Sequence, residues 1–250
     1  MNKKDITKAQ SLPVVMGNEL IQKSRYSLSL MEQKALLFMV SKITPNDEPD
    51  KEYPFSFSEF EAVCNLNKDG GKSKALVNQM LIGMKMKPIE IRLSEKSRVI
   101  TSWFNDAVID EATQTIKISF SKYLIPYLYH LQTFYTLFLL EHTLPMKSKY
   151  GIRLYEFICS VRNKGFKQRY SLDEIKTRLG CENDYNKFVD FRIWAIEPAL
   201  DDINTFTDME VKVEYIKTGR KVSHIEFTIK RAADGYDRFL NRAEALGNDV

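Results

Sequence analysis

The hydrophobic and polar positions of the chain follow one pattern at two places. Residues 55–60 (Phe-Ser-Phe-Ser-Glu-Phe) and residues 170–175 (Tyr-Ser-Leu-Asp-Glu-Ile) share the order aromatic, Ser, apolar, Ser or Asp, Glu, apolar. Repetition of this kind at a long interval indicates two copies of one structural unit.

Each copy predicts a short helix, a turn and a longer helix. Apolar residues after the repeated segment recur with the i, i+4 spacing of an amphipathic helix, and we expect Ser58 and Asp173 to cap the two helices. Turn-forming residues follow in both copies. The predicted turns cover residues 65–71 and 180–186, and the predicted second helices cover residues 72–86 and 186–203.

The segments after the second helices alternate between apolar and polar residues, as β-strands do. In the second copy, residues 210–216 and 222–229 alternate on either side of a charged turn, which predicts a β-hairpin that forms a wing. The first copy is less regular and alternates at residues 89–93, 99–104 and 115–120. Its wing is therefore expected to be longer or to contain an inserted strand.

A helix ahead of each unit completes the organisation. Residues 30–43 and 151–161 carry apolar residues at helical spacing, so each could complete a three-helix core. Both copies then have the order helix, helix, turn, helix, strand, wing, strand. The sequence therefore predicts an α+β protein of two tandem winged-helix domains, each a helix-turn-helix with a β-wing.

The expected domain limits follow from these elements. We place the N-terminal domain at residues 14–124, the C-terminal domain at residues 150–231 and a polar tail at residues 232–250. The intervening residues 125–149 lie in an apolar stretch that predicts mostly helix, so we expect it to join the domains rigidly.

The composition is that of an ordinary soluble protein, because 44% of the residues are hydrophobic and 28% are charged. Its length of 250 residues favours two small domains. The first ten residues have no apolar core of the kind that a secretory signal needs, and the most apolar stretch, 134–140, is far shorter than the ~20 residues that span a bilayer. We therefore expect a cytoplasmic protein.

The titratable residues match no catalytic or metal-binding motif. The three histidines lack a close His or Glu neighbour, which disfavours a metal site and a metal-dependent DNA-nicking enzyme, and the three cysteines lie in apolar helical patterns typical of buried thiols. Residues 70–73 (Gly-Gly-Lys-Ser) imitate the end of a phosphate-binding loop, but Leu66 occupies the position of its first glycine. We expect no enzymatic activity, no metal and no cofactor.

Positive charges of the second copy lie where a DNA duplex would bind. Asn186 and Lys187 open the predicted second helix, whose first turns could enter a major groove ~12 Å wide, and Arg192 follows on the same helix. The wing and the residues beyond it supply cations suited to phosphate contact: Lys217, Arg220, Lys221 and Lys230. A basic hairpin alone is more often a solvated turn, but its place after a helix-turn-helix favours DNA binding.

Two features limit the surface that can face DNA. Carboxylates make the predicted second helix acidic overall, and Pro198 should kink or end it near Trp194. Only the first turns are therefore expected to contact DNA.

Cations of the first copy are more scattered. Lys72 and Lys74 lie on its second helix and Arg98 lies in the wing region. This distribution favours contact with the DNA backbone over base recognition, and a solvated face is an equally weighted alternative.

Several stretches resemble a known family. They are residues 27–37 (Ser-Leu-Ser-Leu-Met-Glu-Gln-Lys-Ala-Leu-Leu), 120–124 (Phe-Ser-Lys-Tyr-Leu), 150–156 (Tyr-Gly-Ile-Arg-Leu-Tyr-Glu), 199–204 (Ala-Leu-Asp-Asp-Ile-Asn), 219–222 (Gly-Arg-Lys-Val) and 225–227 (Ile-Glu-Phe). In this order, the chain resembles the iteron-binding plasmid replication initiators, which consist of two winged-helix domains.

The resemblance implies a function. It implies that the protein binds direct repeats at an origin in double-stranded DNA, that the C-terminal domain makes the main base contacts, and that its wing contacts phosphates. It also implies host replication proteins as partners. Homodimers formed through the N-terminal domain would bind an operator and repress the protein's own gene.

Two other functions remain open. A dimeric winged-helix transcriptional repressor would share every motif and differ only in binding an inverted repeat in place of a direct-repeat array. A protein-interaction module would have the same fold, with wings that are only solvated. Its binding to DNA would lack the steep salt dependence that phosphate contacts produce.

Overall fold

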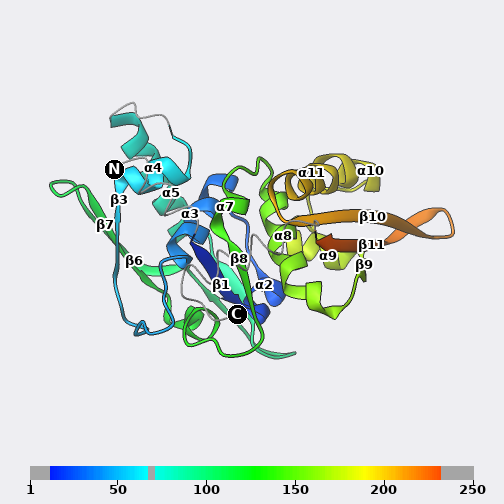
Figure 1. Ribbon diagram of the computed structural model, residues 1–250, viewed down its shortest axis with the longest axis horizontal. Coiled ribbons are helices and arrows are strands. Elements are labelled where there is room, and N and C mark those ends of the chain that lie inside the picture. Colours follow the sequence, from blue (N-terminus) through cyan, green and yellow to red (C-terminus); the bar gives the residue numbers. More distant parts are fainter. Residues whose placement is uncertain (1–11, 67–70, 232–250) are drawn as a thin grey trace. The chain divides into compact units, whose positions relative to one another are not determined.

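The chain divides into two compact units between Leu144 and Pro145. The computed structural model describes residues 12–66 and 71–231 (Figure 1), so the tail expected at residues 232–250 lies outside the described residues. The segment 125–149, which we expected to join the domains, belongs to the first unit as far as Leu144.

The first unit contains the predicted helices. They are α3 (Leu30–Val40), α4 (Phe57–Val63) and α5 (Gly71–Met86). An antiparallel sheet accompanies them in the order β3 (Tyr53–Ser56), β7 (Thr115–Phe120) and β6 (Phe104–Asp110). Three buried aromatic rings join helices to sheet, because the Phe38 centroid lies 5.4 Å from that of Phe55 and 5.6 Å from that of Phe60.

A second small sheet is inserted before the wing of the first unit. Its order is β2 (Ser24–Arg25), β4 (Ile89–Arg92) and β5 (Arg98–Thr101), all antiparallel. The expectation of an inserted strand is therefore confirmed. The wing itself is the β6–β7 hairpin, and Arg98 of the predicted wing region lies on the inserted β4–β5 hairpin ahead of it.

The stretch 122–149 is less helical than its apolar composition predicted. After the short α6 (Ile125–Leu128) it forms β8 (Tyr135–Leu139), which pairs antiparallel with β1 (Pro13–Gly17), and then α7 (Leu140–Thr143). The Thr136 hydroxyl donates a hydrogen bond to the Asn18 side chain at the start of α2 (Asn18–Lys23). Tyr135, Thr136 and Phe138 favour a strand, and pairing with β1, a segment distant in the chain, completes it.

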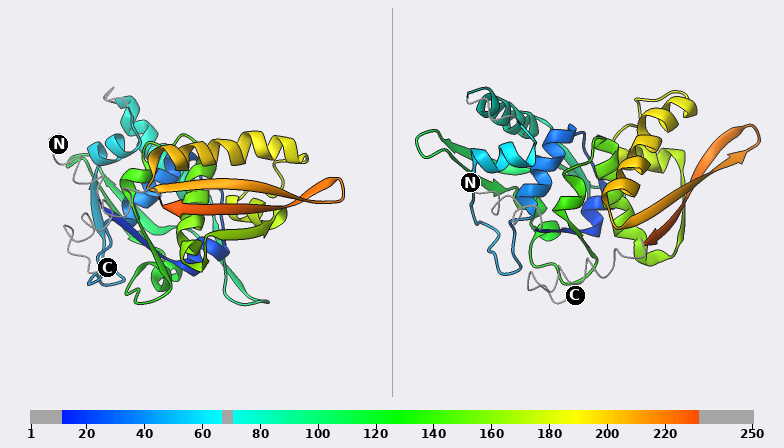
Figure 2. Two further views of the ribbon diagram at one scale, coloured as in Figure 1. Left: turned by 45° about the vertical axis from the view of Figure 1, so that its right-hand side comes forward. Right: turned by 45° about the horizontal axis from the view of Figure 1, so that its top comes forward.

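The second unit repeats the organisation of the first (Figure 2). Its elements are α8 (Lys149–Val161), β9 (Lys167–Ser171), α9 (Leu172–Leu179), α10 (Phe188–Phe191), η3 (Arg192–Ile196), α11 (Glu197–Phe206), β10 (Met209–Thr218) and β11 (Lys221–Arg231). The sheet has the order β10-β11-β9, which corresponds to β6-β7-β3 of the first unit. The repeated sequence segment thus lies at a strand-to-helix junction in both units, and the strands β3 and β9 were missed from the sequence.

The repeated segment works as a capping box. The Ser56 and Ser171 hydroxyls accept the backbone N–H of Glu59 and Glu174, and each Glu carboxylate accepts the N–H of its Ser in return. The expectation that Ser58 and Asp173 are the caps is wrong by two residues. A Ser followed three residues later by Glu was the signal in the sequence that could have identified the true caps.

Replacing Ser171 with alanine is expected to lower the free energy of unfolding of the second unit by about 1 kcal/mol, since the Glu174 N–H loses its acceptor. Asp173→Ala is the matched control and should cost about 0.3 kcal/mol through the helix dipole alone. Urea unfolding of both variants measures the difference. Equal losses would contradict the assignment of Ser171 as the cap.

The cysteines are free thiols. Cys159 and Cys181 are buried and Cys64 is partly buried, and burial raises the pKa of each thiol to about 12. Nowhere in the described part do three or more His, Cys, Asp or Glu side chains gather in an arrangement that could hold a metal ion. Within residues 12–66 and 71–231, no helix has the length and apolar character needed to cross a membrane.

Candidate nucleic-acid interface

The predicted second helix of the second unit, which follows the turn after α9, consists of α10, η3 and α11. Helical structure continues without a break from Phe188 to Phe206, and Pro198 lies in the first turn of α11. The backbone N–H of Glu197 donates to the carbonyl of Arg192, five residues earlier, so the chain takes a wide π-type turn just before the proline. Pro198 was predicted to kink or end the helix near Trp194; the helix does not end there, and the π-type turn at Arg192–Ile196 is the irregularity at this place.

The start of this helix is open to solvent. Lys187 is the N-cap residue and is exposed, its side chain makes no capping hydrogen bond, and Asn186 beside it is also exposed. Both side chains can therefore reach out from the first turn without breaking a contact that holds the helix.

Arg192 is placed differently. Its Nε lies 3.3 Å from a carboxylate oxygen of Glu197 on the same helical run, and its side chain is only 40% exposed. A DNA phosphate would have to compete with this carboxylate, so the geometry favours Arg192 less than Lys187 as a DNA contact.

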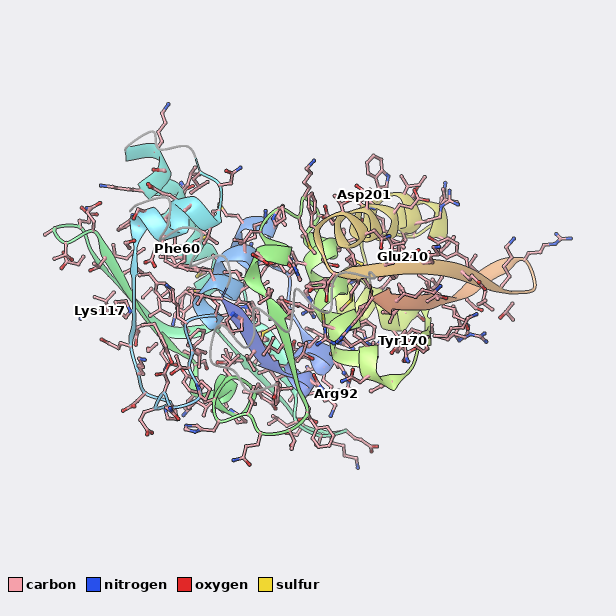
Figure 3. The ribbon with its side chains drawn as sticks, in the orientation of Figure 1. Phe60, Arg92, Lys117, Tyr170, Asp201 and Glu210 are labelled. Carbon is pink, nitrogen blue, oxygen red and sulfur yellow. The ribbon has the colours of Figure 1, made fainter. Side chains whose placement is uncertain are left out.

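One carboxylate of this helix has a structural role and does not face solvent. Asp202 is buried and its carboxylate accepts the backbone N–H groups of Lys147 and Ser148, at 3.0 and 2.7 Å, ahead of α8. Asp201 is exposed on α11 (Figure 3), several turns beyond Lys187. The exposed carboxylates thus lie mainly on the later turns.

The wing is a long hairpin with a two-residue turn. Thr218 and Lys221 face one another in register, with Gly219 and Arg220 between them, and the φ of +62° at Gly219 suits a residue without a Cβ. Lys217, Arg220 and Lys221 are all exposed. No Asp or Glu occurs between residues 215 and 225, so the positive charge of the tip is not balanced along the hairpin.

At the base of the same sheet, two basic side chains are paired with a carboxylate. Arg169 and Lys167 on β9 lie 2.7 and 3.2 Å from the Glu226 carboxylate. Hydrogen bonds from these two side chains hold the pKa of Glu226 below its usual range. Lys230 is exposed but is paired in register with Glu210, which Figure 3 labels, and this favours it less than the tip as a phosphate contact.

Helix and wing are fixed to each other. The Phe188 and Tyr215 rings meet edge to face, with centroids 5.0 Å apart, where the helix begins. At the other end, the Asn204 side chain accepts the Val211 N–H at 2.7 Å and donates to the Val211 carbonyl at 3.1 Å. The start of the helix and the hairpin therefore form one preorganised surface.

The cations predicted in the first unit do not gather in this way. Lys72 is exposed and Lys74 partly exposed in the first turns of α5, while Arg98 lies 3.7 Å from the Glu90 carboxylate on the inserted hairpin. The tip of the first wing carries Asp110 and Glu111, both exposed. The tips of the two wings thus differ in charge, and this difference was not predicted from the sequence.

Sequence reasoning also missed an exposed apolar group on the second helix. Val189, Ile193 and Trp194 are 53%, 38% and 66% exposed, whereas Phe191 between them and Ala195 after them are buried. Their spacing, opposite the buried positions, was the signal that could have identified them.

Comparison with known proteins agrees with this architecture. The family described as "Initiator Replication protein, WH1" matches residues 13–159, and the family described as "Initiator Rep protein, WH2" matches residues 171–229. A replication initiation protein from Escherichia coli is 28% identical over 250 residues, which cover 95% of this chain and 74% of that protein.

A solved structure has the same fold. The crystal structure of Pi initiator protein in complex with iteron DNA aligns with a TM-score of 0.72 and 17% identity, over 90% of this chain and 99% of that chain. The two winged-helix units expected from the sequence are therefore confirmed. Because the first family match alone spans more than half of the sequence, this chain belongs to the initiator replication protein family.

Proposed function

We propose that this protein initiates replication by binding direct repeats in the DNA of a plasmid origin. The observation that carries the proposal is the hairpin tip of the second unit, where Lys217, Arg220 and Lys221 are exposed and the hairpin is fixed to the start of the second helix through Phe188 and Tyr215. In this reading the second unit is the main DNA reader.

The charges of the second unit indicate which part would contact phosphates and which part would contact bases. The wing would hold phosphates, because its tip carries three cations without a carboxylate between residues 215 and 225. The start of the helix, at Asn186 and Lys187, would reach base edges in the major groove. The Pi initiator, which shares the fold, was crystallised with iteron DNA, and this supports the proposal.

The first unit would extend the DNA footprint and mediate self-association. Its scattered cations, such as Lys72, fit contact with the DNA backbone, whereas its wing tip is acidic and does not. Helix α5 also exposes Leu76, Ile82 and Met86, at 42%, 62% and 77%, which supports a protein contact there. Repression of its own gene by a dimer, contact with host replication proteins and a cytoplasmic location belong to the same proposal.

A salt-titrated binding assay tests this function. The purified chain is mixed with the duplex that flanks its own gene and with a scrambled duplex of the same composition. Stepwise, salt-sensitive binding to a direct-repeat array is the expected result. A single complex on an inverted repeat would favour a transcriptional repressor, and no preference for either duplex would contradict DNA recognition and favour a protein-interaction module.

Lys187→Ala is expected to reduce the ratio of cognate to scrambled affinity about 10- to 100-fold, because a side chain at a base edge discriminates between sequences. Arg220→Ala should weaken binding to both duplexes alike. Lys164→Ala, beyond the base of the sheet, is a charge-matched control and should change neither value. If Lys187→Ala lowers both affinities equally, base recognition lies elsewhere.

A further inference from the structure

The outward face of the second helix changes in character along its length. Exposed positions recur about once per turn, first at Val189 and Asp190, then at Ile193 and Trp194, and then at Glu197 and Asp201. The first two turns of this face are thus mostly apolar and the later turns are acidic. The first part carries the exposed carboxylate of Asp190 and the later part carries those of Glu197 and Asp201, so phosphates would repel the later turns more strongly.

Val189 and Ile193 share a face with the open start of the helix. They are four residues apart, and residues at this spacing are neighbours on a helix surface. Asn186 and Lys187 are exposed and directly precede the first helical turn, in which Val189 lies. An apolar pair therefore continues directly from the polar residues proposed to reach the base edges.

The surroundings of this apolar pair indicate a duplex as its occupant. The adjoining wing has an unbalanced positive tip, and the Phe188–Tyr215 contact fixes the hairpin beside the first helical turn. An apolar protein or lipid partner would leave these cations without counter-charges. The phosphates that border a major groove would supply them.

Within the major groove, one common group is apolar. Each base pair presents hydrogen-bond donors or acceptors, but only thymine adds a methyl group, at its C5 position. We propose that Val189 and Ile193 contact thymine methyl groups and so determine part of the sequence specificity. This inference rests on the proposed DNA-binding function and names the chemistry by which the helix reads its site.

The test removes the methyl group and nothing else. The full-length protein first selects its preferred sequence from a random duplex library. The selected duplex is then synthesised with thymine, or with uracil at every thymine position, and the affinities of the two forms are compared. The wild-type protein is expected to bind the uracil form about fourfold more weakly for each methyl that it contacts.

A double variant links the effect to these side chains. Val189→Ala combined with Ile193→Ala should bind the two forms with nearly equal affinity, and both side chains are exposed, so the fold should persist. Phe166→Ala removes another exposed apolar side chain of the same unit, 76% exposed, and should keep the full difference. Circular dichroism checks that each variant is folded.

The outcomes separate this inference from the function on which it rests. Equal wild-type binding to both forms, or a full difference retained by the double variant, would overturn the thymine contact and leave DNA recognition intact. If the protein selects no sequence from the library, the proposed function fails and the inference fails with it.

Discussion

Replacing Lys217, Arg220 and Lys221 together with alanine is expected to weaken DNA binding about 100-fold at about 0.15 M salt. Each cation that neutralises a phosphate releases counterions and adds about 0.9 to the slope of log affinity against log salt. Loss of three contacts should therefore make this slope shallower by about 3. The effect should be the same on cognate and scrambled duplexes, because phosphates carry no sequence information.

Affinity measured over a salt series tests this prediction. The wild-type and triple-variant lines should converge toward about 1 M salt, where the counterion contribution vanishes. Lys147→Ala with Lys164→Ala removes two exposed lysines outside the hairpin and should leave the slope nearly unchanged. An unchanged slope in the triple variant would mean that the wing does not contact phosphates.

Glu156→Ala is expected to lower the free energy of unfolding of the second unit by about 3–5 kcal/mol. Glu156 and Arg153 are buried in α8, with side chains 2% and 5% exposed, and Arg153 Nη1 donates to the Glu156 carboxylate at 2.7 Å. Removing the carboxylate would take a charged hydrogen-bond partner away from a buried guanidinium. The cost is large because solvent cannot reach this charge.

A second variant shows whether the cost comes from the charge that remains buried. Arg153→Met with Glu156→Leu removes both charges and keeps much of the side-chain volume, so its stability should lie within about 1 kcal/mol of wild type or above it. Urea unfolding monitored by circular dichroism measures both variants. If the double variant is as unstable as Glu156→Ala, packing or another contact of these side chains explains the loss.

Much of the fold could be predicted from the sequence. The helices α3, α5, α8 and α9, the hairpin β10–β11 and the duplication itself follow from periodicities of about 3.6 and 2 residues, and each periodicity acts within one element. The insertion in the first unit was recognisable because its alternating stretches outnumbered those of the second unit. The exposed cations of the second wing followed from the turn residues Gly219 and Arg220.

The candidate site was predicted less completely. The polar start of the helix and the basic wing were identified, but Arg192 is engaged with Glu197, and the apolar pair Val189 and Ile193 was not recognised. Pro198 was expected to kink or end the helix, which instead continues through a π-type turn just before the proline. Such a turn depends on a few backbone hydrogen bonds and leaves no periodic signal in the sequence.

The order of the helices, the β10–β11 hairpin and the positive charge of its turn followed from the sequence alone, because helical periodicity, alternation and turn chemistry depend on neighbouring residues. Tertiary structure decided which segments became strands, as in the pairing of β8 with β1 and of β9 with β11. It also decided which side chains face solvent, since burial depends on the element that packs against them. Strand pairing and burial join residues far apart in the chain, and local patterns carry little information about such contacts.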